Sequence, residues 1–433
     1  MDERPLVGIV VVNYNGGDLT IRCLESLHRL TYPRECTRIV LVDNGSNDRV
    51  VARVRREFPG VDVVETGRNL GFGGGCNRGF ERLPDVDYVA LINNDAVAEP
   101  GWLDPLVNAL EGDPTLGAAA PKVLLRGFYH ELVLSTKGTR VEVDPRLLGV
   151  QVGQVCVGDQ DVTAEVEWAA GFWAPESSRT GLHHYRWTMD RATMLVPTRH
   201  VAPITIELAI PGGATRTVTI ESGAVTAQVN VGAYERVTLE PTGPGSRVIN
   251  NAGAVVLEDF SLADRGFLEV DIGQYDREED VEAWSGAAVV LRRTYIDDVG
   301  RFDEPFFLYY EDADLSWRGR NRGWRYRYIP TSLVEHEHSA SARSMGSLVR
   351  HLSARNRLVM LTKVAPAPVA RRAWLSFLRE VAATYARDVI LRAVSGRWPV
   401  TAHAFAMSRV MLGALRLAPR AIILRRAARG SRR

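Results

Sequence analysis

Four short apolar runs in the first 95 residues each end abruptly in polar side chains. They occupy residues 7–12, 38–42, 61–65 and 88–92, and stretches with helical spacing of apolar residues separate them. Apolar runs of this length are typical of buried parallel strands, and their alternation with helices predicts a doubly wound α/β sheet. The carboxyl ends of such strands meet at one edge, where open α/β sheets bind their ligands. The pattern therefore predicts a ligand cleft at that edge.

The residues that end these runs have suitable chemistry for such a cleft. Asn93, Asn94 and Asp95 follow the fourth run. Their oxygens suit hard cations such as Mg²⁺ or Mn²⁺, which in turn hold a diphosphate. A plain turn after a strand is the alternative, because the same residue types dominate turns. Asp43 ends the second run, and its carboxylate is able to accept the imide N–H of uracil or thymine.

A glycine-rich segment at residues 67–75 follows the third run. It fails the dinucleotide-binding fingerprint because Cys76 stands where a third glycine is required, and the sequence contains no phosphate-binding Gly-Lys-Ser/Thr loop. Glycines let a backbone approach a ligand closely, and a flexible turn is the alternative. Either Asp18 or Thr20 is expected to cap the helix after the first strand.

Several motifs follow one another in a fixed order along the chain. They are VVNYN at residues 11–15, VDNGS at 42–46, NLGFGGGCNRG at 69–79, WSGAA at 284–288 and FDEPFFLYYED at 302–312. Over residues 5–125 and about 282–363 the chain resembles an inverting family 2 glycosyltransferase, particularly the bacterial rhamnosyltransferase-like members. The resemblance implies a GT-A type fold that binds a nucleotide-diphosphate sugar. The family's metal-binding Asp-x-Asp motif begins with Asn93 here, which leaves Asp95 as its only charged ligand.

The resemblance also implies roles for individual residues. Asp312 is expected to deprotonate the acceptor hydroxyl, with Glu311 beside it as a second catalytic residue. Asp95 and His336 are expected to hold Mn²⁺ or Mg²⁺, which stabilises the leaving nucleoside diphosphate. His338 competes for the metal role, and two surface histidines without metal are the alternative. The residues expected to bind substrate are Val12, Asn13, Tyr14, Asn15, Asp43, Asn44, Asn69, Gly71, Gly73, Gly74, Asn93, Asn94, Trp284 and Gly286.

The acidic cluster at residues 311–314 also has a structural interpretation. Acidic side chains favour a helix N-terminus, and Asp314 and Arg318 have the spacing of a helical ion pair. We assign the structural role to Asp314 and the chemical role to Asp312. A base at the start of a helix is expected to stay ionised near neutrality.

Residues 126–281 lie outside the resemblance. Alternating apolar runs at residues 203–208, 217–220 and 227–231, punctuated by Gly and Pro, predict an inserted antiparallel sandwich. The insertion either helps to select the acceptor or serves as an accessory interaction domain. Its aromatic residues are either core, which we favour, or platforms for sugar rings; they are Trp168, Phe172, Trp173, Tyr185 and Trp187.

The C-terminal tail differs in charge from the rest of the chain. After Pro366 there are 14 arginines, no lysine, and only Glu380 and Asp388 as acids, whereas the preceding residues carry 39 basic and 50 acidic groups. Helical spacing of its apolar residues predicts basic amphipathic helices, which suit an anionic membrane surface. Helices that pack on the enzyme with solvated arginines are an equal alternative. The interleaved apolar residues argue against binding to nucleic acid.

The expected fold class is α/β, with four parts. Residues 1–125 are the nucleotide-sugar-binding part, 126–281 the inserted β-rich domain, 282–363 the acceptor and catalytic part, and 364–433 the basic helical tail. The four cysteines lack metal spacing, the acidic N-terminus is unlike a signal peptide, and no apolar stretch reaches membrane-spanning length. A cytoplasmic protein is therefore expected, with peripheral attachment to the inner face of the cell membrane as a further expectation from the tail.

The function expected from the resemblance is glycosyl transfer with inversion. The donor is expected to be a dTDP- or UDP-linked sugar, with rhamnose favoured, and the acceptor a glycan or lipid-linked cell-envelope intermediate. A nucleotidyltransferase is the rival enzyme class, but it would need a basic residue on the α-phosphate where this chain offers mainly glycines. A non-catalytic carbohydrate-binding or scaffold protein is the third interpretation, and the intact Asp43, Asp95 and Asp312 argue against it. The sequence does not indicate the oligomeric state.

Overall fold

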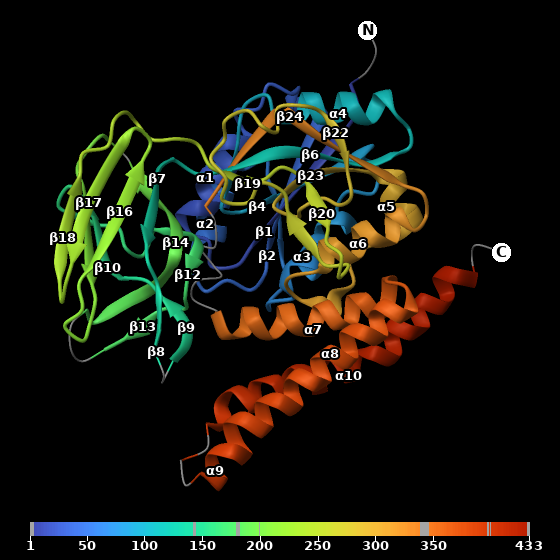
Figure 1. The fold of residues 1–433 in the computed structure, drawn as a ribbon. Helices are drawn as coiled ribbons and strands as arrows, with labels where there is room; N and C mark the ends of the chain where they lie inside the picture. Colours follow the sequence, from blue (N-terminus) through green and yellow to red (C-terminus); the bar gives the residue numbers. More distant parts are fainter. Residues whose placement is uncertain are drawn as a thin grey trace. The chain divides into compact units, whose positions relative to one another are not determined.

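The computed structural model (Figure 1) describes residues 4–141, 144–178, 182–198, 200–337, 346–395, 398 and 400–430. The chain divides into two compact units. The first unit comprises Met1–Val123, Asn251–Arg265 and Tyr275–Arg433, and the second comprises Leu124–Asn250 and Gly266–Gln274. The second unit is therefore inserted in the sequence of the first.

A mixed sheet forms the centre of the first unit. The order of its main strands is β22 (Glu279–Val281), β24 (Arg325–His336), β6 (Leu116–Leu125), β23 (Ala288–Arg292), β4 (Tyr88–Asn93), β1 (Val7–Asn13), β2 (Thr37–Asp43) and β3 (Asp62–Glu65). β4, β1, β2 and β3 are parallel, whereas β23 runs antiparallel to β4. The four expected strands are therefore confirmed, with ends that differ by one residue.

Helices cover both faces of this sheet because side chains of a strand point alternately to opposite faces. In β1, Ile9 and Val11 belong to one core cluster, which includes residues of α1 (Asp18–Leu27), α2 (Val50–Glu57) and α4 (Leu103–Gly112). Val10 belongs to the opposite cluster, with residues of α3 (Gly71–Glu81), α5 (Arg293–Val299) and α6 (Glu311–Arg320). The doubly wound arrangement is thus confirmed.

Two local expectations at the helix starts are wrong. The residue before α1 is Gly17, and no side chain caps this helix; the Thr20 hydroxyl donates to Asn13 Oδ1 instead (2.7 Å). The flexible-turn alternative fails for the glycines of residues 71–75, which lie inside α3. A Cβ on Gly75 would lie 2.6 Å from Val12 Cγ1, and one on Gly79 would lie 2.4 Å from Val10 Cγ1. These glycines let α3 pack closely on β1, which offsets their low helix propensity.

The second unit is an antiparallel β domain, as the alternating runs predict. Its strands pack around one apolar core and follow the order β17 (Val225–Val231), β16 (Arg216–Ser222), β7 (Phe128–Thr136), β14 (His184–Thr198), β10 (Gln151–Val157), β15 (Ile204–Ala209) and β18 (Glu235–Leu239). Trp187 is buried, and Trp168 and Phe172 pack against the core. These three aromatics therefore have the structural role that we favoured.

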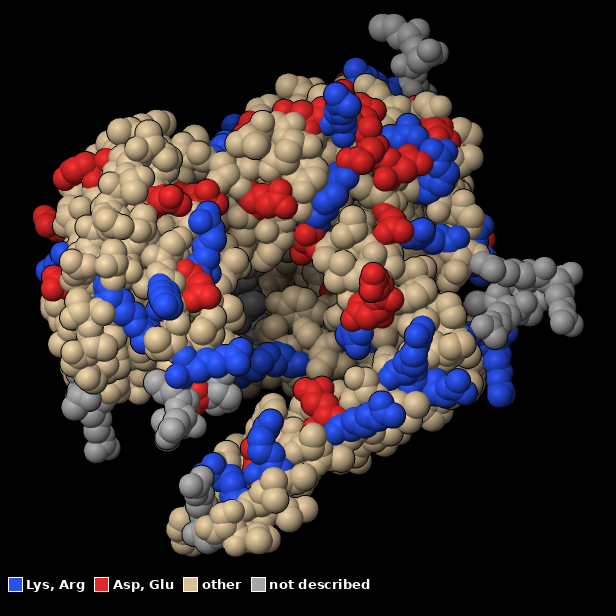
Figure 2. All heavy atoms as spheres, viewed as in Figure 1, with Lys and Arg blue, Asp and Glu red and all other residues tan. Residues whose placement is uncertain are grey.

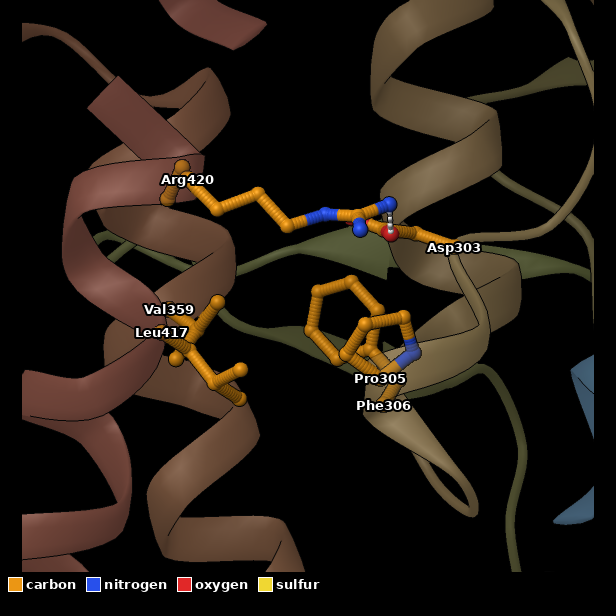
Figure 3. A pocket seen from close by; sticks show the side chains of 7 residues that line it. Asp303, Pro305, Phe306, Val359, Leu417 and Arg420 are labelled. Carbon is orange, nitrogen blue, oxygen red and sulfur yellow. Dashed lines mark hydrogen bonds and ion pairs between the residues drawn. The ribbon is translucent and has the colours of Figure 1, made fainter. Parts of the chain in front are cut away.

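The C-terminal helices pack on the first unit. α7 (Gly346–Val364), α8 (Ala367–Tyr385) and α10 (Thr401–Gly430) share an apolar cluster with Phe306 and Ala313. In Figure 3 the Arg420 side chain of α10 reaches across a small pocket to Asp303, where Nη2 lies 2.7 Å from Oδ1. The packing alternative is therefore correct for this part of the tail. Within the described ranges, no helix is both long enough and apolar enough to cross a membrane.

Candidate active site

The carboxyl ends of β1, β2 and β4 meet at the side chain of Asn13, which is fully buried. Its Nδ2 donates to Asp43 Oδ1 and to Ser46 Oγ, both at 2.9 Å. Its Oδ1 accepts from Thr20 Oγ1 (2.7 Å) and Asn94 Nδ2 (3.0 Å). Asn13 thus joins three loops at one sheet edge. The strand ends converge as expected, and a hydrogen bond joins Asn94 to Asn13.

Asp43 is held by its own loop. Its Oδ1 accepts from Asn13, its Oδ2 accepts from the Ser46 backbone N–H (3.1 Å), and the residue is 4% exposed. A carboxylate oxygen has further lone pairs, so a contact with the imide of a base stays a prediction.

Asn44 and Asn69 organise the start of α3. Asn44 Nδ2 donates to the Gly71 carbonyl (2.9 Å) and to Asn69 Oδ1 (3.2 Å), and Asn44 Oδ1 accepts from Leu70 N–H (3.1 Å). Asn69 Oδ1 also accepts from Gly71 N–H (2.8 Å). The two side chains therefore shape the wall of the candidate site.

The glycines expected to bind substrate are covered by neighbouring segments. A Cβ on Gly71, which has φ +77°, would lie 2.1 Å from the Phe307 carbonyl oxygen. A Cβ on Gly73 would lie 3.6 Å from Glu311 Cβ, and one on Gly74 would meet Leu70. Their small size brings α3 close to the segment that carries the acid pair.

Three expected residues lie at or after the end of β1. Val12 is partly buried against α3, and Tyr14 is 39% exposed. Asn15 has φ 54°, and its Oδ1 accepts from Asn47 N–H (2.7 Å). Tyr14 and Asn15 are both exposed, so either is accessible to a ligand.

Asp95 and His336 lie next to each other at the same edge. His336 ends β24 and pairs in register with Ala96 of β5 (Ala96–Ala98). Its Nε2 lies 3.0 Å from Asp95 Oδ1 and 3.2 Å from Asn93 Nδ2. The competing His338 falls outside the described residues.

A carboxylate and an imidazole fit a Mn²⁺ or Mg²⁺ ion whose other ligands are phosphate and water, because Mg²⁺ usually keeps waters and substrate phosphates in its shell. Across the ranges that the structure describes, no group of three His, Cys, Asp or Glu side chains would hold an ion without such help. Asp95 and His336 are therefore compatible with a metal shared with the substrate.

Glu311 and Asp312 begin α6. The Gly286 N–H donates to Asp312 Oδ2 (3.0 Å), and the Ala313 N–H donates to Oδ1 (2.7 Å). Burial raises the pKa of Asp312 above its usual range, and these two hydrogen bonds oppose the rise. That Asp312 stays ionised near neutrality therefore stays a prediction.

Glu311 differs from a surface carboxylate in its burial and in its raised pKa. It is 5% exposed, and burial together with the nearby Asp312 raises its pKa to about 8. Its side chain is therefore mostly protonated at pH 7. Burial thus raises the pKa of both neighbouring carboxyl groups, and the two N–H hydrogen bonds to Asp312 favour its charged form.

The indole of Trp284 is buried rather than open to a ligand. It is 1% exposed and packs edge-on against Phe302, with ring centroids 6.2 Å apart. Gly286 lies in the same segment, and a Cβ there would lie 2.8 Å from Phe72 Cε1 and 3.6 Å from Asp312 Oδ2. Trp284 therefore supports the backbone that holds Asp312.

The loop before α6 has an unusual backbone. Phe307, Tyr309 and Tyr310 have φ values of 67°, 67° and 73°, a region that non-glycine residues rarely adopt. Such residues cost on the order of 1–3 kcal/mol each and persist only where their surroundings enforce them. Asn356 of α7, fully buried, supplies the enforcement. Its Nδ2 lies 2.9, 2.9 and 2.8 Å from the carbonyl oxygens of Phe306, Leu308 and Tyr309.

A charge cluster lies behind the acid pair. The predicted ion pair is confirmed, with Arg318 Nε 2.8 Å from Asp314 Oδ2. Lys363 of α7 lies 2.8 Å from both Asp314 Oδ2 and Asp303 Oδ2. We did not foresee Asn356 or Lys363. The sequence offers one signal for them, because Asn356 and Lys363 flank the apolar run at residues 358–361.

Comparison with known proteins identifies similar sequences and loosely aligned solved structures. Residues 8–127 match the family model described as glycosyl transferase family 2. An N-acetylglucosaminyl-diphospho-decaprenol L-rhamnosyltransferase of Mycobacterium tuberculosis is 24% identical over 355 residues, which are 79% of this chain and 80% of that protein.

Two solved structures align more loosely. The mannosyltransferase PcManGT from Pyrobaculum calidifontis in complex with GDP-Man and Mn²⁺ has a TM-score of 0.42 and 14% identity, covering 96% of this chain and 88% of that one. GalNAc-T7 with UDP, GalNAc and Mn²⁺ has a TM-score of 0.43 and 13% identity, covering 84% and 48%.

Proposed function

The chain belongs to glycosyl transferase family 2 and has a GT-A type fold, and from this premise we propose that it transfers a sugar from a nucleotide diphosphate with inversion. The observation that carries the proposal is the acid pair at the start of α6. Asp312 is fixed by the N–H groups of Gly286 and Ala313, beside a Glu311 that is protonated at neutral pH. One ionised carboxylate in a defined orientation suits a single proton transfer.

In the proposed mechanism Asp312 accepts the proton of the acceptor hydroxyl as that oxygen attacks the anomeric carbon. The bond between the anomeric carbon and the diphosphate oxygen breaks on the opposite face, and its electron pair leaves with the diphosphate. A raised pKa makes Asp312 a stronger base than an exposed carboxylate. Because Glu311 is uncharged, it does not repel the developing negative charge of the acceptor oxygen.

Asp95 and His336 are the residues that would hold Mn²⁺ or Mg²⁺ in this proposal. When bound, such a cation stabilises the negative charge of the leaving diphosphate. The 3.0 Å contact between their side chains supports a common role for both residues. Asn94, bonded to Asn13, would hold the neighbouring turn in place.

The donor and acceptor are finer parts of the proposal. A dTDP- or UDP-linked donor suits Asp43 as a partner for the imide of thymine or uracil. A rhamnosyl group and a lipid-linked cell-envelope acceptor are supported by the name of the mycobacterial relative. We place the reaction on the cytoplasmic side of the membrane. The nucleotidyltransferase is the weaker candidate, because the glycine-rich segment at residues 67–75 offers mainly glycines, with Arg68 as its one basic residue.

The test is a donor and acceptor screen with the full-length protein. dTDP-, UDP- and GDP-linked sugars would be offered with short-chain prenyl diphospho-sugars, and products identified by mass spectrometry. The anomeric configuration of the product, measured by NMR, reports inversion. We expect one dTDP- or UDP-sugar to be transferred with inversion. A retained anomeric configuration would overturn the mechanism. In a parallel reaction with a nucleoside triphosphate and a sugar 1-phosphate, release of pyrophosphate and formation of a nucleotide sugar would establish the rival chemistry.

A further inference from the structure

The far end of the helical hairpin formed by α8 and α10 is built differently from its base. We call it the hairpin tip. It comprises the π-helical segment η4 (Ala386–Leu391), α9 (Arg392–Val394), Trp398, and the first residues of α10 up to Phe405. The hydroxyl groups of Tyr385 and Ser408, 2.9 Å apart, join the two helices where the tip begins. Figure 1 shows α9 at the end of the hairpin opposite to the C-terminus of α10.

The tip exposes large apolar side chains in close succession. The exposed fraction is 91% for Trp398, 81% for Val394, 62% for Phe405, 60% for Leu391 and 57% for Ile390. Single exposed apolar residues are common on soluble proteins, but a contiguous group of them marks an interaction site. The tip is therefore a candidate docking surface.

Basic side chains continue this surface along α10. Phe405, Arg409, Leu412, Arg416 and Ile423 follow one another at intervals of three, four or seven residues, so they lie on one helical face. All five are exposed. Residues 401–430 contain six arginines and no aspartate or glutamate. Figure 2 shows basic groups spread along the hairpin between uncharged residues.

We propose that the hairpin tip docks onto an anionic lipid bilayer, with its apolar side chains in the headgroup region and the arginines on the lipid phosphates. Exposed apolar side chains among arginines suit a bilayer interface, because the apolar groups enter the headgroup region and the arginines attract anionic lipid. Tryptophan favours the same region. A second copy of this chain is the poorer occupant, because two surfaces rich in arginine repel each other.

Contacts with the enzyme hold the base of the hairpin in place, so the docking surface is confined to the tip and the exposed face that continues it. Arg420 pairs with Asp303, and Arg425 Nη1 donates to the Thr362 carbonyl (2.9 Å). Trp374 of α8 donates to Thr362 Oγ1 (2.8 Å). The base is thus fixed to the enzyme. Since α10 rises about 1.5 Å per residue, Phe405 lies roughly 22 Å along the helix from Arg420. Removing the whole tail would therefore damage the enzyme, whereas substitutions of exposed residues in the tip and at Arg409 and Arg416 test docking alone.

The experiment is flotation of the full-length protein with vesicles. Vesicles of phosphatidylcholine alone would be compared with vesicles containing phosphatidylglycerol, at low and high salt. The apolar variant is Trp398→Ser/Phe405→Ser, and its matched control is Ile272→Ser/Val201→Ser, which changes two apolar residues that are 82% and 58% exposed elsewhere. The charge variant is Arg409→Glu/Arg416→Glu, and its control is Arg29→Glu/Arg34→Glu, which changes two other exposed arginines.

We expect the unmodified protein to float with the anionic vesicles and less so as salt rises. Both double variants should lower the bound fraction at least about tenfold, while both controls and the melting temperature stay unchanged. Failure of the unmodified protein to bind anionic vesicles would overturn the proposal, as would equal binding by the double variants and their controls. Concentration-dependent dimers that Trp398→Ser abolishes, without vesicle binding, would assign the surface to a second copy instead. None of these outcomes depends on which sugar is transferred.

Discussion

The Nζ atom of Lys363 lies 2.8 Å from Oδ2 of Asp314, and both side chains are almost completely buried. Asp314 follows Asp312 by two residues on α6, whereas Lys363 is near the end of α7. This ion pair therefore ties the C-terminal helices to the helix that carries the proposed base. The C-terminal helices thus act as part of the site's support.

Lys363→Met should destabilise the protein. The substitution removes one cation from each of two carboxylates. Among the residues that the structure describes, Asp314 then keeps only Arg318 as an ion-pair partner, and Asp303 keeps only Arg420. Because each carboxylate keeps an arginine, the loss of unfolding free energy should stay below the roughly 3–5 kcal/mol that an uncompensated buried charge costs. Urea denaturation measures the change, and Arg82→Met, which breaks a surface pair with Asp62, serves as the control. An equal effect of both substitutions would contradict the buried role.

Glu311→Gln should change how stability depends on pH. Burial and Asp312 raise the Glu311 pKa from 4.5 to about 8, so the folded state keeps a proton that the unfolded state releases. This contribution to stability is full below about pH 4.5 and is lost as pH rises through about 8. The variant cannot titrate there, so its unfolding free energy should fall less between these values. Urea denaturation at several pH values tests this, with the exposed Glu25→Gln as the control; parallel curves would refute it.

Asp312→Asn should abolish transfer and leave donor binding nearly unchanged. The amide keeps the shape of the side chain and still accepts from Gly286 N–H, but it cannot take the acceptor proton. Loss of a general base lowers turnover by roughly 10²–10⁴-fold. Single-turnover assays measure the chemical step, and calorimetry with the donor measures binding. Near-normal turnover in the variant would remove Asp312 from the mechanism.

Asp95→Ala should weaken donor binding only when metal is present. With Mn²⁺, loss of the carboxylate ligand should raise the donor Kd about tenfold or more, because the cation links Asp95 to the diphosphate. In chelator, the variant and the unmodified protein should bind the donor equally. Calorimetry in both conditions provides the comparison, with His336→Ala as a parallel variant. Full transfer activity in chelator would exclude a metal requirement.

Asn356→Ala should lower kcat while the KM for the donor stays the same. Without the amide, the carbonyls of Phe306, Leu308 and Tyr309 lose the contact that supports their unusual backbone. The loop would relax and displace Asp312, which does not contact the donor's nucleotide in our proposal. Steady-state kinetics at the temperature where the variant is fully folded separates this effect from instability. A change in donor KM alone would contradict a positioning role.

Local patterns predicted the elements that depend on neighbouring residues in the chain. The four strands, the polar residues at their ends and the Asp314–Arg318 pair were all visible as periodicity or spacing. The glycines of residues 71–75 were not recognised as helical, because glycine disfavours helices unless packing on another element compensates. That compensation comes from Val10 and Val12 of β1, which local spacing does not reveal.

The sequence by itself determined the α/β architecture, the family motifs and the separate β-rich insertion, because apolar periodicity is a local property. Only the tertiary structure decided which side chains meet across long separations. Lys363 with Asp314, and Asn356 with the loop at residues 306–309, join elements that no spacing rule connects. Burial also decided the protonation of Glu311 and divided the basic tail into a packed base and an exposed tip. Desolvation depends on every atom that surrounds a group, and those atoms come together only in the folded chain.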